Sequence, residues 1–200
     1  MDCWSATNTE LCGDAEDLTF HDGLFYVITP REELFRYKAS NHADGTIKVR
    51  SQDMTMSESW QGQLASGEIV ARYLLPSASG EDLHMVKRYV HPMKGTWRFQ
   101  VFTLLPKQGG TACRRFYPMW GQVLFVGRGC SRAFDTGNRQ RGCVYFLDDV
   151  YRGGPMSVLQ QDKYLCTDTG SFCCLPKKPD EIIRCLPREL ASDSSPPIWY

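Results

Sequence analysis

Four cysteines near the C-terminus are the residues whose chemistry would be most distinctive: Cys166, Cys173, Cys174 and Cys185. Thiolates at suitable spacing hold zinc, and a vicinal pair such as Cys173 and Cys174 can cycle between thiol and disulfide. The four positions lack the paired spacing that is typical of structural zinc sites, and no histidine lies nearby. We therefore expect no metal, and a metal- or redox-responsive protein that uses this cluster is the alternative hypothesis.

The chain has nine cysteines in all, and its N-terminal residues lack the basic and apolar segments of a secretory signal. A protein that stays inside the cell keeps its thiols reduced. The longest apolar runs, at residues 101–105 and 123–126, are far shorter than a membrane helix, which needs about 20 residues. The sequence therefore predicts an intracellular protein, in the cytoplasm or nucleus, with thiols rather than disulfides.

Three further motifs contain reactive residue types but lack the context that the chemistry needs. The glycines Gly127 and Gly129 miss the third glycine of a dinucleotide fingerprint and the Gly-Lys-Ser/Thr ending of a P-loop. Asp148 and Asp149 end a predicted strand, where Asp commonly accepts backbone N–H groups in a turn. Ser131 does not lie in a Gly-x-Ser-x-Gly elbow. We therefore predict no enzyme, with no catalytic residue and no cofactor.

A basic segment follows Val126. It contains Arg128, Arg132, Arg139 and Arg141, with Phe134 among them. This composition is typical of a weak nucleic-acid patch or an acidic-peptide groove, and also of a solvated loop. The 23 Lys and Arg residues are balanced by 23 Asp and Glu residues, so no long-range field attracts the chain to nucleic acid or to a membrane. We expect a solvated loop, and neither nucleic acid nor a membrane as partner.

The elements that would position these residues are short strands joined by turns. The pattern recurs at roughly fifty-residue spacing, which is typical of propeller blades. It predicts units at residues 17–51, 69–117 and 120–160, followed by a tail at 161–200. With 42% hydrophobic residues, the chain can form one domain with a core. The predicted fold is all-β: residues 1–200 form a partial β-propeller of about three four-stranded antiparallel blades plus an irregular C-terminal tail.

Two strand patterns allow a more detailed expectation. Residues 18–28 predict a hairpin that is buried on both sides, with a turn at residues 21–23. Trp97, Phe99 and Val101 alternate with polar neighbours, which predicts a strand with one wetter face. The aromatic side chains that we expect in the core or at its seams are Trp97, Trp120 and Trp199.

Several strings in the chain resemble the plant KIB-type β-propeller domain that is associated with many F-box proteins. They are, in order, AEDLTFHDGLFYVIT, ARYLLPSASGEDLHMVKRYV, FQVFTL, GQVLFVGRGCSRAF, GCVYFLDD and SPPIW. The resemblance runs from about Ala15 to Trp199. It implies a propeller without a catalytic site whose loops bind proteins, and in full-length relatives an F-box that docks on the Skp adaptor of a cullin ubiquitin ligase.

The chain departs from that pattern, because it lacks a helical F-box segment and the first blades. We therefore do not expect contact with the Skp adaptor, and a truncated or non-functional remnant is a further alternative. Fewer blades than the roughly four to eight of a closed propeller would leave strand edges open to pairing with another chain. The preferred function is a non-catalytic protein-binding module. Its expected contact loops are Ser51–Ser66, Lys107–Ala112 and Arg128–Arg141.

Overall fold

The computed structural model of the 200-residue chain describes several stretches, most of them strands. They are residues 14–41, 45, 47–54, 68–107, 110–116, 121–137, 142–147, 149, 168–173 and 181–183, of which 51–54, 105–107, 110–116 and 181 are described by their backbone alone. These stretches form three separate β-sheets and contain no helix. None of them, accordingly, holds a helix that could reach across a lipid bilayer.

The first sheet contains four antiparallel strands in sequential order. They are β1 (Asp17–His21), β2 (Leu24–Ile28), β3 (Leu34–Asn41) and β4 (Ile47–Met54). Asp22 and Gly23 link β1 to β2 with φ values of 47° and 73°. Two residues with positive φ make the turn whose twist matches that of the flanking strands, which is why an Asp-Gly pair closes this hairpin.

The position of this hairpin is confirmed, but the expectation that it is buried on both sides is wrong. Val27 and Ile28 are buried, whereas Leu18 is 48% and Phe20 is 55% exposed. The two faces of the hairpin differ. The face with Ile28 and the partly buried Tyr26 packs against the middle sheet, whereas Leu18, Phe20 and Phe25 on the other face are exposed.

The middle sheet also has four antiparallel strands in sequential order. They are β5 (Ile69–Pro76), β6 (Leu83–His91), β7 (Gly95–Lys107) and β8 (Gly110–Phe116). Every residue of β6 from Leu83 to Val90 is buried, because both faces of the sheet are covered. Met85 belongs to a core cluster that includes Ile28 of the first sheet, whereas Val86 belongs to one that includes Val144 of the third sheet.

Strand β7 differs from the expected alternation. Trp97 is 43% exposed, and Gln100 is buried with its Oε1 accepting a 2.6 Å hydrogen bond from the Tyr89 hydroxyl. The pairing with β6 is irregular here, since Tyr89 lies opposite Arg98 and the next residue, Val90, lies opposite Thr96. Trp97 is thus the extra residue of a β-bulge and points outward. The predictions of a buried Trp97 and of a wetter face on this strand are therefore wrong.

The third sheet contains five strands in the order β10-β9-β11-β12-β13. They are β9 (Gln122–Val126), β10 (Arg132–Asp135), β11 (Cys143–Phe146), β12 (Gly170–Cys173) and β13 (Glu181–Ile183). Strands β9 and β11 pair in parallel, unlike the antiparallel blade expected, because β10 returns to the edge of the sheet after β9. Strands β12 and β13 come from residues assigned to the tail, so part of that tail completes a sheet.

The prediction of a loop at Arg128–Arg141 is wrong for its central residues, because Arg132–Asp135 form β10. The other two loops expected to bind partners also begin or end within strands, since β4 continues to Met54 and β8 begins at Gly110. Trp120 and Trp199 lie outside the described residues, as does most of Ser51–Ser66. The propeller loops are therefore shorter than the sequence predicts.

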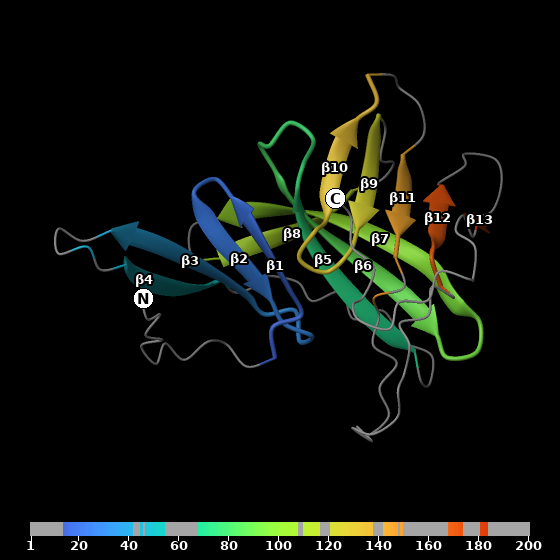
Figure 1. The fold of residues 1–200 in the computed structure, drawn as a ribbon, viewed down its shortest axis with the longest axis horizontal. Helices are drawn as coiled ribbons and strands as arrows, with labels where there is room; N and C mark the ends of the chain where they lie inside the picture. Colours follow the sequence, from blue (N-terminus) through green and yellow to red (C-terminus); the bar gives the residue numbers. More distant parts are fainter. Residues whose placement is uncertain are drawn as a thin grey trace, which may run out of the picture.

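Figure 1 shows the three sheets side by side, with the first sheet in blue, the middle sheet in green and the third sheet in yellow to red. Strands β1 and β5 lie next to each other, as do β5 and β10. No sheet of the described residues closes on itself. The architecture is therefore the all-β, partial propeller that the sequence predicts.

Candidate functional site

Two buried cations of the middle sheet point in opposite directions. Lys87 and Arg88 are consecutive residues of β6, so their side chains leave opposite faces of the sheet. Their side chains are 2% and 0% exposed, respectively. A buried charge is tolerated only where it is paired and hydrogen-bonded. Each face must therefore supply carboxylates, and each of the two neighbouring sheets does so.

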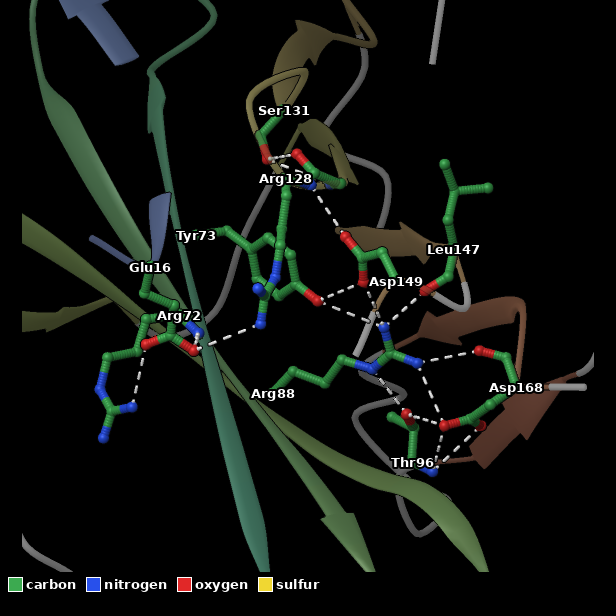
Figure 2. A network of polar contacts seen from close by, with 11 residues as sticks. Glu16, Arg72, Tyr73, Arg88, Thr96, Arg128, Ser131, Leu147, Asp149 and Asp168 are labelled. Atoms are coloured by element: carbon green, nitrogen blue, oxygen red, sulfur yellow. Dashed lines mark hydrogen bonds and ion pairs between the residues drawn. The ribbon is translucent and has the colours of Figure 1, made fainter. Parts of the chain in front are cut away.

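Arg88 is surrounded by acceptors from the third sheet and its connections (Figure 2). Its Nη1 lies 3.1 Å from Oδ1 of Asp149 and also donates to the carbonyl of Leu147. Its Nη2 donates to Oδ2 of Asp168 at 3.1 Å and to the carbonyl of the same residue at 2.9 Å. Its Nε donates to the Thr96 hydroxyl at 2.6 Å. All three guanidinium nitrogens are thus engaged.

The Arg88 cluster is formed by Arg88, Tyr73, Thr96, Asp149 and Asp168. Its members also shift one another's pKa values. Burial alone would lower the pKa of Arg88, but the oxygens of Tyr73, Asp149 and Asp168 outweigh it and raise that pKa. Burial raises the pKa of Tyr73 well above its usual value, and the 2.7 Å hydrogen bond to Asp149 adds to this effect. Both groups stay protonated at neutral pH. The cluster is therefore built to join two sheets, not to exchange protons.

The opposite face of the middle sheet carries the Arg72 cluster, formed by Arg72, Lys87, Glu16 and Glu32. Nη1 of Arg72 lies 3.1 Å from Oε2 of Glu16, and its Nη2 lies 3.1 Å from Oε1 of Glu32. Nζ of Lys87 lies 2.6 Å from Oε2 of Glu32. Two cations thus balance two carboxylates. Glu32 has a φ of 65°, a strained value for a residue other than glycine, and the two ion pairs offset that strain. Burial raises the pKa of Glu16, although Arg72 opposes the change.

One carboxylate touches all three sheets. Asp17, at the start of β1, accepts the backbone N–H of Leu74 in β5 at 2.7 Å. Its other oxygen accepts the N–H of Gly129, in the turn between β9 and β10, at 2.7 Å. Burial raises the pKa of Asp17 to about 6, and hydrogen bonds from the backbone N–H groups of Leu74, Gly129 and Leu18 only partly oppose that shift. This carboxylate therefore links the first sheet to the middle sheet and to the turn that begins the third sheet.

A groove of about 420 Å³ opens between β1 and β10. Its lining consists of Leu18, Thr19, Phe20, Pro76, Gly129, Cys130, Ser131, Arg132, Ala133 and Phe134. Phe134 is 52% exposed, similar to Phe20. Monomeric proteins seldom expose adjacent large apolar side chains unless something binds them. In the two ionic clusters the charged groups pair with one another. The groove, by contrast, exposes Phe20 and Phe134, which a partner could cover.

The structure corrects the prediction that all cysteines are thiols. Cys143 of β11 and Cys173 of β12 lie directly opposite each other, with a Cα–Cα distance of 4.4 Å, and form a disulfide. No local sequence pattern predicts this bond, because the two residues are 30 positions apart. Cys166, Cys174 and Cys185 lie outside the described residues. Across the parts that the structure describes, no group of three or more His, Cys, Asp and Glu residues could hold a metal ion.

The motifs near the start of the third sheet have structural roles. Gly129 has a φ of 67°, which a glycine turn between two strands requires. The Ser131 hydroxyl donates to the Gly127 carbonyl at 2.9 Å and accepts the Gly127 N–H at 3.1 Å, so it secures this turn. Asp149 accepts the N–H of Arg128 at 2.8 Å, which confirms the expected role of a carboxylate that binds backbone. Asp148 lies outside the described residues.

The sites predicted from the sequence do not include Arg88, Lys87 or Asp17. A signal was present, because a Lys-Arg pair in the middle of an otherwise apolar strand indicates buried charges that need partners on both faces. The partners themselves carry no local signal. Asp168 is 80 residues away from Arg88, and Glu32 is 55 residues away from Lys87.

Comparisons with known proteins agree with this architecture. The family model described as the KIB1-4 beta-propeller matches residues 1–172. Comparison with curated proteins and with solved structures finds no match. The family match covers most of the 200 residues and includes the first two sheets and nearly all of β12. The chain therefore belongs to the KIB1-4 beta-propeller family.

Proposed function

We propose that this chain is a non-catalytic protein-binding module that resembles the substrate-recognition propeller of F-box proteins. The observation that carries the proposal is the groove between β1 and β10, where large apolar side chains remain exposed beside a rigid scaffold. Binding residues are commonly displayed at strand ends and turns that such a scaffold positions. The module acts inside the cell, and it needs no Skp contact of its own to bind a partner.

The test is direct binding to an identified protein. The folded chain and a heat-unfolded control are immobilised, and proteins captured by the folded chain alone are identified by mass spectrometry. Each candidate is then purified and titrated against the chain by calorimetry. Saturable binding with a defined stoichiometry supports the proposal. If no captured protein binds the purified chain in a saturable way, the chain is not a protein-binding module.

A second candidate function, redox response, is favoured by the disulfide between Cys143 and Cys173. A dithiol reductant would deliver two electrons and two protons to this bond, giving two thiols and a disulfide in the reductant. Reduction would release β12 from its covalent link to β11. Thiol titration under native conditions tests this idea. Two additional thiols after mild reduction, together with altered binding to the captured partner, are expected.

A further inference from the structure

We propose that the groove binds an extended segment of a partner protein that is both apolar and acidic, and that this segment adds as a strand to the free edge of β10. The inference rests on the proposed protein-binding function and specifies the chemistry of the partner. Strand addition obtains affinity from main-chain hydrogen bonds and specificity from pockets for alternate side chains. The groove offers both.

Strand β10 has an open edge. It is the outermost strand of the third sheet, and within the part of the chain that the structure describes it pairs with β9 alone. Thr136 donates its N–H to the Gly121 carbonyl at 2.8 Å, which sets the alternation of hydrogen-bonded pairs along the strand. By that alternation the N–H and C=O of Ala133 point away from β9, and no described residue bonds to them. An incoming strand would satisfy these groups.

The groove has an apolar wall on each side. Leu18 and Phe20 project from β1, and Phe134 projects from β10, all about half exposed. Phe134 meets the Phe125 ring edge-on at a centroid distance of 5.6 Å, which holds the ring in place. Proteins usually guard an edge strand with charges or proline. Strand β10 carries two such charges, Arg132 and Asp135, but the exposed Phe134 between them and Phe20 across the groove leave apolar surface for association.

The groove also carries a positive charge. Arg132 is exposed, and among the described residues that line the groove no other is charged. No ion pair joins it to a carboxylate among the described residues. By contrast, Arg128 in the neighbouring turn already lies 4.0 Å from Glu16. A partner carboxylate is the natural complement of the guanidinium of Arg132, since arginine binds carboxylates with two parallel hydrogen bonds.

The geometry also limits the size of the segment. Strand β10 has 4 residues, and β1 has 5. At about 3.3 Å per residue, a bound strand of four to six residues would span roughly 13–20 Å. Its side chains on one face would cover Phe20 and Phe134, and an Asp or Glu would reach Arg132.

The experiment uses a phage-displayed library of random peptides panned on the full chain. We expect enriched peptides to alternate apolar residues with Asp or Glu. The best synthetic peptide is titrated by fluorescence anisotropy against the full chain and against Arg132→Glu and Phe134→Ser. Each substitution should weaken binding at least tenfold, as for residues at the centre of an interface. The matched controls are Arg31→Glu, an exposed arginine outside the groove, and Trp97→Ser, an exposed aromatic residue on β7; both should leave affinity unchanged.

A second peptide carries N-methyl groups on alternate amides, so that its side chains are kept but its main-chain donors are lost. Strand addition predicts that binding falls at least tenfold for the methylation register that faces β10 and remains unchanged for the other register. Equal binding in both registers would overturn strand addition. Circular dichroism of each variant shows whether it is folded. Since Arg132 and Phe134 are exposed, at least one of the two variants is expected to keep its fold.

The outcomes separate this inference from the proposed function. If the captured partner binds the full chain but is unaffected by Arg132→Glu and Phe134→Ser, the groove inference is wrong and the binding function stands. If neither peptides nor proteins bind, the binding function itself is wrong. Enriched peptides that are basic overturn the charge argument. A dimer in sedimentation that Phe134→Ser converts to monomer would show that a second copy, not a partner peptide, occupies the groove.

Discussion

Removing the guanidinium of Arg88 should strongly destabilise the protein. The substitution Arg88→Met keeps the apolar length of the side chain but leaves the carboxylates of Asp149 and Asp168 buried, at 4% and 2% exposure, without their cation. Breaking a buried ion pair by removing one partner costs about 3–5 kcal/mol. For a chain of this length, such a loss lowers the melting temperature by about 6–20 °C. The loss is a large share of a typical free energy of unfolding, about 5–15 kcal/mol.

The assay is urea denaturation followed by circular dichroism, with the free energy of unfolding extrapolated to water. Arg98→Met is the matched control, because the Arg98 guanidinium only lies over the Tyr89 and Trp97 rings, at 5.3 and 5.9 Å from their centroids. A cation–π contact of this kind contributes about 0.5–1 kcal/mol. We expect the control to lose no more than this amount.

A double-mutant cycle tests the cause of the loss. If the penalty comes from uncompensated buried charge, Arg88→Met combined with Asp168→Asn should cost less than the sum of the two single variants. The coupling should exceed about 1 kcal/mol, since residues in one buried network are not additive. Additive single variants that each cost less than about 1 kcal/mol would refute the claim that this cluster joins the two sheets.

Three further predictions concern pH, redox state and backbone conformation. The folded-state pKa of Asp17, about 6, lies above its ordinary value of 3.8, so its contribution to stability is full below 3.8 and is lost as the pH rises through 6. Measuring the free energy of unfolding between pH 4 and 7 should show a loss of about 2–3 kcal/mol that is absent in Asp17→Asn, and an unchanged slope in that variant would contradict the assignment. Reducing the bond between Cys143 and Cys173, or replacing Cys143 by Ser, should lower the free energy of unfolding by about 3–4 kcal/mol, because the bond closes a loop of 30 residues. Equal denaturation midpoints with and without reductant would argue against the bond in solution. In Gly23→Ala the added Cβ meets no atom within 4 Å, but alanine must adopt a φ of 73°. Thermal melting should therefore show that the free energy of unfolding falls by about 1–2 kcal/mol because of the backbone alone. No loss would mean that the turn has changed type.

Much of the fold was predictable because strands and turns depend on local patterns. The Asp22-Gly23 pair marks a two-residue turn wherever it joins alternating apolar residues, and the structure has it there. The exposed Trp97 was not predictable, because a β-bulge is set by pairing with a neighbouring strand. The parallel pairing of β9 with β11 likewise depends on where β10 returns, which no short window encodes.

The candidate site was harder to predict than the fold. The basic and aromatic composition around Arg132 and Phe134 was visible in the sequence and allowed an acidic-peptide groove among its interpretations. The placement of that segment on an edge strand facing Leu18 was not visible, because more than a hundred residues separate the two sides. The disulfide was not predicted for a related reason. Thiols are expected from the redox state that is typical of the cell interior, whereas the bond depends on Cys143 of β11 lying opposite Cys173 of β12.

Local sequence patterns predict that this chain is made of short strands, that the first hairpin turns at Asp22-Gly23, and that the fold is a propeller. These properties follow from backbone preferences and side-chain periodicity, which act over a few residues. Long-range contacts in the folded protein give Lys87 and Arg88 their ion-pair partners on opposite faces of β6, let Asp17 bind groups of the other two sheets, and place β1 and β10 on the two sides of a groove. Those outcomes require groups far apart in the chain to meet, and their free energy arises only when burial removes water from all of them together.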